Sequence, residues 1–149
     1  MLKKLCIVSS CGGHLTEVRE LQSIYTTYPH FYVLNDKAIL ANNMRDKTYF
    51  VTHSERDWKF IINLYEAYKI IKKERPHAIL STGAGGVVPF AIIGKFLFGV
   101  KILYIETWSS VERPSLTGRI MYYLADYFYY QWQPLKKFFA RGEYIGSLL

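Results

Sequence analysis

The chain has 149 residues, of which 50% are hydrophobic and 17% aromatic. That length allows one well-buried core and is too short for two ordinary domains, so we expect a single domain over residues 1–149. The formal net charge of +7 favours anionic partners such as phosphates, nucleic acid or an acidic membrane surface. The two cysteines, Cys6 and Cys11, do not form a disulfide framework, which indicates a reducing cytoplasm.

The apolar segments predict neither a secretory signal nor a membrane span. The first apolar run is too short for a signal-peptide core. Residues 87–105 form the most apolar stretch, but Pro89, Lys95, Gly99 and Lys101 interrupt it. We therefore expect a soluble or peripheral protein, in the cytoplasm at the inner face of the cell membrane.

Strand-like and helix-like patterns alternate along the chain. Strands are predicted at residues 4–9, 30–34, 49–52, 78–81, 101–106 and 127–130, and helices at 15–25, 57–75, 87–98 and 116–125. Residues 35–47 form a loop or a short helix around 38–42. The apolar face of the helix at 57–75 is expected to consist of Phe60, Ile61, Leu64, Ala67, Tyr68 and Ile71. This alternation predicts βαβ units and a mostly parallel, Rossmann-like α/β sheet.

The first loop of interest is Ser9-Ser10-Cys11-Gly12-Gly13-His14, between the first predicted strand and helix. Small residues at such a corner expose backbone N–H groups that suit an anion, so Ser10, Gly12 and Gly13 are candidate phosphate-binding residues. The alternative is a tight turn with no ligand. The three-glycine dinucleotide fingerprint is not met. His14 is a candidate general base, a phosphate ligand or merely a residue of the helix start.

A second glycine-rich loop, Thr82-Gly83-Ala84-Gly85-Gly86, follows the predicted strand at 78–81. Close packing of helix on sheet would explain its glycines without a ligand. Two such loops at one sheet edge favour a shared polyanionic ligand, however, and Thr82, Gly83, Gly85 and Gly86 are candidate binding residues.

Glu106 stands at the carboxyl end of the strand at 101–106, on the same predicted edge. It is a second candidate for the catalytic base. Acids at strand ends also cap loops or pair with arginines, and Arg113 and Arg119 are possible partners.

No metal or cofactor is predicted. His14, His30, His53 and His77 lack recognised ligand spacing, and the cysteines form no paired motif. The positive charge is compatible with nucleic acid, but no recognised binding motif is present, so we do not expect a nucleic-acid partner.

Several motifs together suggest a family. They are Ser10-Cys11-Gly12-Gly13-His14, Ser81-Thr82-Gly83-Ala84-Gly85-Gly86, Glu106-Thr107-Trp108-Ser109, Ser115-Leu116-Thr117-Gly118-Arg119, Ala125-Asp126 and Gln131-Trp132-Gln133-Pro134-Leu135. Their order and spacing resemble the small subunit of two-part GlcNAc and galactose transferases. That family includes the membrane-recruiting subunit of the eukaryotic dolichol-linked oligosaccharide enzyme and the PssD and CpsF proteins of bacterial exopolysaccharide and capsule synthesis.

The resemblance implies the N-terminal, acceptor-side half of a GT-B glycosyltransferase, similar in layout to MurG. A separate polypeptide would supply the half that binds the UDP-sugar, either UDP-GlcNAc or UDP-galactose, and this chain would be inactive alone. The acceptor would be a polyprenyl-diphosphate-linked sugar, with the two glycine loops and His14 beside its diphosphate or reacting sugar. The eukaryotic members carry an N-terminal membrane span, whereas the first strand here begins almost at Met1, so recruitment to the membrane surface would be peripheral.

In the family the C-terminal tail docks the partner subunit. Residues 140–149 would have that role here, with Tyr144, Ile145, Leu148 and Leu149 as the apolar contacts. The alternative interpretation of the whole sequence is a self-contained nucleotide- or phosphate-binding α/β enzyme.

Overall fold

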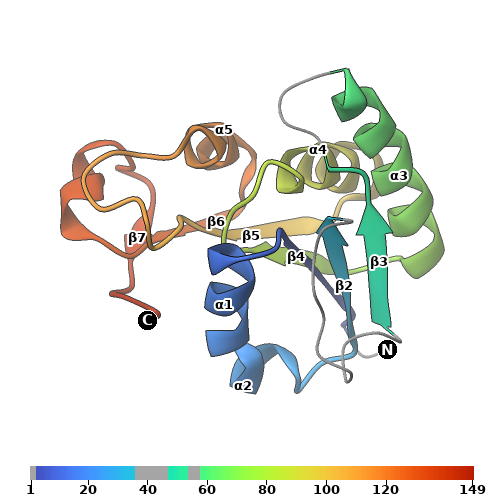
Figure 1. Ribbon diagram of the computed structural model, residues 1–149, viewed down its shortest axis with the longest axis horizontal. Coiled ribbons are helices and arrows are strands. Elements are labelled where there is room, and N and C mark those ends of the chain that lie inside the picture. Colours follow the sequence, from blue (N-terminus) through green and yellow to red (C-terminus); the bar gives the residue numbers. More distant parts are fainter. Residues whose placement is uncertain (1–2, 36–46, 54–57) are drawn as a thin grey trace.

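The computed structural model describes residues 3–35, 47–53 and 58–149. Within these ranges, seven strands form one sheet in the order β3-β2-β1-β4-β5-β6-β7, and every neighbouring pair is parallel (Figure 1). The strands are β1 (Leu5–Ser9), β2 (His30–Asn35), β3 (Thr48–Val51), β4 (Ala78–Ser81), β5 (Lys101–Ile105), β6 (Tyr127–Tyr130) and β7 (Glu143–Tyr144). The predicted α/β class with a parallel sheet is confirmed.

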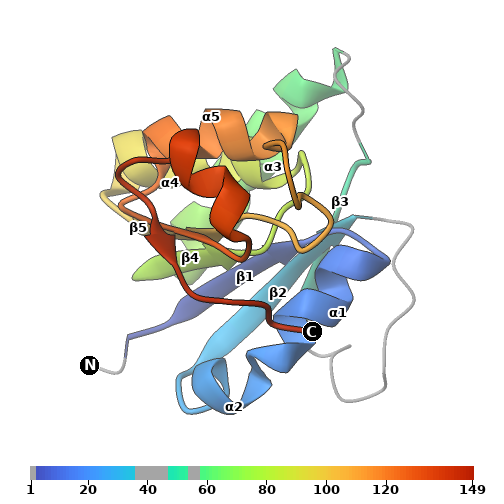
Figure 2. The ribbon, with the colours of Figure 1, turned by 90° about the vertical axis from the view of Figure 1, so that its left-hand side faces the viewer.

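Helices cover both faces of the sheet. They are α1 (Gly13–Glu20), α2 (Gln22–Tyr25), α3 (Lys59–Glu74), α4 (Val87–Phe98), α5 (Leu116–Leu124) and a 3-10 helix, η2 (Gln133–Lys137). α1 and α2 lie on one face, and α3, α4 and α5 on the other (Figures 1 and 2). Two apolar cores result. The larger lies under α3 to α5, and the smaller consists of Ile7, Leu15, Val18, Tyr25, Tyr32 and Leu34 under α1 and α2.

The strand order determines where a ligand can enter. The chain begins at β1, moves outward to β2 and β3, and then returns to β4 on the other side of β1. The connections after β1 and β4 therefore leave the sheet in opposite directions, which opens a crevice at the carboxyl ends of these strands.

Three predicted helices differ from the structure at their ends. The helix predicted at 15–25 is two helices, because Leu21 has φ −87° and ψ 6° and interrupts the regular geometry between α1 and α2. α5 ends at Leu124 because Ala125 is extended, with ψ 140°. Asp57, the predicted first residue of α3, and the possible helix at 38–42 lie outside the described residues. Trp58 occupies the N-cap position of α3.

The predicted apolar face of α3 is partly wrong. Ala67 and Ile71 are fully buried as expected, but Ile61 is 70% exposed and Tyr68 36% exposed. The helix is rotated so that Asn63 is buried instead, where its amide donates to the carbonyl oxygen of Thr52 at 2.8 Å.

Candidate functional site

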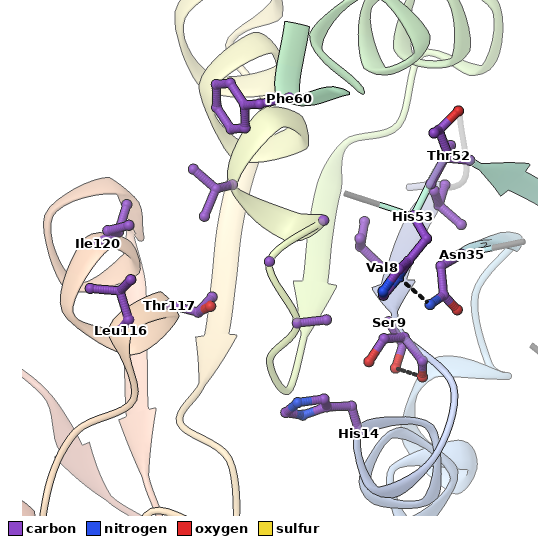
Figure 3. Close-up of a pocket in the computed structure, with 17 residues that line it drawn as sticks. Val8, Ser9, His14, Asn35, Thr52, His53, Phe60, Leu116, Thr117 and Ile120 are labelled. Carbon is purple, nitrogen blue, oxygen red and sulfur yellow. Dashed lines mark hydrogen bonds between the residues drawn. The ribbon is translucent and has the colours of Figure 1, made fainter. Parts of the chain in front are cut away.

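A cavity of about 660 Å³ lies at the carboxyl edge of the sheet (Figure 3). The ends of β1, β2 and β3 form one wall, and the glycine loop before α4 and the first turns of α5 form the other. Polar side chains include Ser10, His14 and Thr117, whereas Phe60 and Ile120 add apolar surface. A space of this size with a few convergent polar groups is typical of small-molecule sites.

The first glycine loop begins helix α1 beside this cavity. Gly12 has φ +85°, which favours glycine, and its carbonyl oxygen accepts the N–H groups of Leu15 and Thr16 at 3.1 and 3.2 Å. The N–H groups of Gly13 and His14 have no partner among the described residues, as is usual in a first helical turn. Ser10 and His14 line the cavity, whereas Gly12 and Gly13 are exposed next to it.

The second glycine loop forms the facing wall. Gly83 and Ala84 have φ of +134° and +80°, and the Ser81 hydroxyl stabilises this turn by donating to the Gly83 carbonyl oxygen at 2.8 Å. Gly85 and Gly86 line the cavity, whereas Thr82 and Gly83 lie behind them, against His14.

His14 joins the two loops. Its Nδ1 lies 3.3 Å from the Thr82 carbonyl oxygen, and the Thr82 hydroxyl donates to the His14 carbonyl oxygen at 2.9 Å. A Cβ on Gly83 would lie 2.5 Å from Nδ1 and Cε1, so glycine is required for the ring to sit there. Because a carbonyl oxygen only accepts, this contact places the proton of a neutral imidazole on Nδ1 and leaves the Nε2 lone pair available.

Two side chains that the sequence analysis did not select for this site lie in the wall formed by the ends of β1, β2 and β3. The Asn35 Oδ1 atom accepts the Cys11 N–H at 3.1 Å, and its Nδ2 lies 2.9 Å from Nδ1 of His53 (Figure 3). Asn35 thus fixes the first glycine loop to the end of β2. His53 was considered only as a zinc ligand; its position at the end of β3 brings it to the same edge.

Glu106 does not line this cavity. It is fully buried beneath α5, where its Oε1 accepts the Thr107 N–H at 3.2 Å and its Oε2 has no hydrogen-bond partner among the described residues. Burial raises the pKa of this carboxyl group, and the nearby Ser115 and Ser110 hydroxyls offset part of the rise. α5 approaches so closely that a Cβ on Gly118 would lie 1.3 Å from Oε2.

The possible arginine partners lie elsewhere. Arg113 and Arg119 form no ion pair with Glu106 in the described part of the chain; they line a separate surface hollow with Glu112 and Lys137.

The sequence analysis missed a buried carboxylate one helical turn after His14. Glu17 is 2% exposed and accepts hydrogen bonds from the Thr107 hydroxyl, the Trp108 N–H and the Gln131 amide at 2.7, 3.0 and 2.9 Å. Its Oε1 lies 4.0 Å from His14 Nδ1. The available signal was the i, i+3 spacing of an acid and a histidine at the start of a helix.

The C-terminal residues lie along the β7 edge of the sheet and reach α1 (Figure 2). Tyr144, Ile145 and Leu149 are 46%, 42% and 53% exposed. Leu148 is half-buried, and its N–H donates to Gln131 Oε1 at 2.8 Å.

The described residues contain neither a candidate metal-binding cluster nor a helix that could cross a membrane. In residues 3–35, 47–53 and 58–149, no three His, Cys, Asp or Glu side chains are grouped so that they could bind a metal ion. No described helix is both long and apolar enough to span a bilayer.

The fold and the cavity define the class of protein. The structure superposes on MurG of Acinetobacter baumannii with a TM-score of 0.72 at 13% identity, covering 89% of this chain and 42% of that one. A Methanocaldococcus jannaschii UDP-GlcNAc 2-epimerase in complex with UDP-GlcNAc and UDP matches with a TM-score of 0.71 at 15% identity, covering 93% of this chain and 43% of that one. The chain thus has the fold of one half of a GT-B glycosyltransferase, as expected.

The family follows from sequence. Residues 52–148 match the family model described as "Oligosaccharide biosynthesis protein Alg14 like", and the chain belongs to this family. The mouse UDP-N-acetylglucosamine transferase subunit ALG14 is 29% identical over 98% of this chain and 83% of its own length. The Candida albicans subunit of the same name is 37% identical over 58% of this chain and 41% of its own length. The expectation that this chain is related to a subunit of a glycosyltransferase is confirmed. The chain spans less than half the length of the fungal relative and of MurG.

Proposed function

We propose that this chain is the acceptor-side subunit of a bipartite glycosyltransferase in capsule or exopolysaccharide synthesis. It binds a polyprenyl-diphosphate-linked sugar, and a separate subunit that it recruits and activates supplies the UDP-sugar. The observation that carries the proposal is the position of His14, which both glycine loops hold at the wall of a cavity of about 660 Å³. Membership of the Alg14 family and the GT-B half fold support it.

The geometry suits the first step of sugar transfer. An acceptor hydroxyl in the cavity must lose its proton as it attacks the anomeric carbon of the donor, whose bond to the diphosphate oxygen breaks so that UDP leaves. Nε2 of His14 accepts that proton, because Nδ1 faces the Thr82 carbonyl oxygen. We assign the base to His14 and not to Glu106, because Glu106 does not line the cavity.

The glycine loops provide the binding site for the acceptor's diphosphate. The N–H groups of Gly13 and His14 begin α1, and Gly85 and Gly86 precede α4, so the positive ends of two helix dipoles point toward the same edge. Ser10 and the Thr117 side chain add polar contacts from either wall. The polyprenyl chain would leave past the apolar side chains Phe60 and Ile120.

The membrane surface that we propose is the outer stripe of α3. Trp58, Ile61 and Tyr65 are 71%, 70% and 62% exposed and recur at helical spacing. Lys69 Nζ lies 5.2 Å from the ring centre of Tyr65, so positive charge flanks the stripe as in helices that rest on anionic lipid. α4 is the more apolar helix, but its first five residues, 87–91, are buried, and its Lys95 pairs with Asp126 at 3.2 Å.

The partner subunit would dock on the C-terminal tail, where Tyr144, Ile145 and Leu149 expose apolar surface at the β7 edge. Unpartnered apolar surface of this kind is typical of an interface.

The proposal is tested with the purified chain, alone and co-expressed with the donor-binding subunit, on a lipid-linked acceptor. We expect no transfer by the chain alone and transfer by the pair, and loss of transfer when His14→Gln is introduced into an intact pair. Robust transfer by the isolated chain contradicts the division into subunits. Calorimetry with UDP-sugars addresses the alternative of a self-contained nucleotide-binding enzyme, which requires tight binding to the chain alone.

A further inference from the structure

We propose that Glu17 is a positioning residue that holds His14 in the tautomer with its proton on Nδ1. The inference deepens the proposed function, on which its consequence for catalysis rests. The inference arises from the position of Glu17. This buried carboxylate accepts hydrogen bonds from all its partners, and it lies beside His14, the histidine that joins the two glycine loops.

The carboxylate oxygens of Glu17 accept hydrogen bonds from three groups in the described part of the chain. Its Oε1 accepts from the Thr107 hydroxyl at 2.7 Å, and its Oε2 accepts from the Trp108 N–H at 3.0 Å and from Gln131 Nε2 at 2.9 Å. All three groups can donate to an ionised carboxylate, and the side chain is only 2% exposed.

The orientation of the Gln131 amide follows from its other contacts. Its Oε1 accepts the Leu148 N–H at 2.8 Å, which leaves Nε2 to donate to Glu17 and to the Glu106 carbonyl oxygen at 3.0 Å. This orientation makes Gln131 a donor to Glu17 and connects the carboxylate to the C-terminal residues.

His14 is the group that responds to this negative charge. Among the described residues, its imidazole is the one group capable of positive charge within ion-pair distance of Glu17, at 4.0 Å between Nδ1 and Oε1. Tyr104 in β5 and Glu106 directly after this strand also face this region, but neither can carry a positive charge. Nδ1 thus lies near two oxygens that only accept, those of Glu17 and Thr82.

The distance defines how Glu17 acts. At 4.0 Å it does not hydrogen-bond to His14, and the direct acceptor of the Nδ1 proton is the Thr82 carbonyl oxygen at 3.3 Å. The carboxylate adds a negative potential at Nδ1, and the burial of Glu17, whose side chain is 3% exposed, limits its screening by water. The proton therefore stays on Nδ1, and Nε2 keeps the lone pair that a general base needs.

The test measures the tautomer of His14 by nitrogen-detected imidazole correlations in the isolated chain, with the signal assigned by its loss in His14→Gln. We expect the Nδ1–H tautomer in the wild type and a shift toward Nε2–H in Glu17→Gln. Glu20→Gln is the matched control, because it removes the same charge from an exposed position of the same helix. An unchanged tautomer in folded Glu17→Gln overturns the proposal.

A second variant keeps the test decisive if Glu17→Gln does not fold. Glu17→Asp keeps the negative charge but withdraws the carboxylate from Nδ1 by one methylene, so it should give a smaller shift of the same sign; an unchanged tautomer there also overturns the proposal. In the assembled transferase, Glu17→Gln should lower kcat by about 100-fold with little change in the acceptor KM. A tautomer shift without loss of transfer would leave the positioning role intact and remove His14 from the proposed chemistry.

Discussion

The contact between α5 and the buried carboxyl group of Glu106 allows a quantitative test of the structure. In Gly118→Ala, the new Cβ would lie 1.3 Å from Glu106 Oε2 and 2.5 Å from its Cδ. Either the helix or the carboxyl group must move. Overpacking of this kind costs about 1–3 kcal/mol, and loss of the bond from the Thr107 N–H to Oε1 adds roughly 1 kcal/mol or more.

Helix propensity acts in the opposite direction. Alanine is favoured over glycine inside a helix by about 1 kcal/mol, so the net loss in unfolding free energy is roughly 1–3 kcal/mol. For a chain of this length, that lowers Tm by about 2–12 °C. The assay is thermal unfolding followed by circular dichroism. Gly13→Ala is the control, because a Cβ at this helical position meets nothing within 4 Å and should leave Tm unchanged or slightly higher.

The double variant identifies the cause. In a Glu106→Ala background the obstructing carboxyl group is gone, so Gly118→Ala should be neutral or stabilising. A Gly118→Ala variant that melts with the wild type, or a cost that persists without the Glu106 carboxyl group, would refute this packing.

Three further outcomes are expected. Burial raises the pKa of Glu106, so its contribution to unfolding free energy is complete below the ordinary glutamate pKa and is lost as pH rises through the raised value; Glu106→Gln should flatten this decline in urea titrations at a series of pH values. Gly83→Ala should displace the His14 ring and lower transfer by the assembled enzyme about 100-fold while circular dichroism remains native. Replacing Ile61 and Tyr65 with serine should weaken sedimentation with anionic vesicles, and equal sedimentation would place the membrane contact elsewhere.

The alternation of strand and helix was predictable because buried parallel strands and amphipathic helices leave strong periodic patterns. β6 was predicted with its observed bounds, Tyr127–Tyr130. β7 was not, since its two residues, Glu143 and Tyr144, are too few to show a period and pair only through the fold. The exposed stripe of α3 was also misjudged, because periodicity reveals that a helix is amphipathic but not which apolar side chains meet the sheet.

The candidate site was predictable where chemistry follows strand ends. The two glycine loops and His14 meet as expected, because the carboxyl ends of parallel strands share one edge. Glu106 follows the same rule along the chain, yet α5 covers it, and no local signal shows that a helix will cross a strand end. Glu17 was missed for the opposite reason: an acid on a helix is ordinarily solvated, and its partners Thr107 and Gln131 lie 90 and 114 residues away.

The hydrogen bond from the Cys11 N–H to Asn35 has a practical consequence for measuring how this protein docks on a partner or a lipid surface. Of its two cysteines, Cys6 is fully buried with a raised pKa and stays an unreactive thiol, whereas Cys11 is exposed. A maleimide dye would thus label the native chain at a single point, on a loop anchored beside the cavity. Energy transfer from that dye to a labelled partner or lipid would report docking in real time, without introducing a new cysteine.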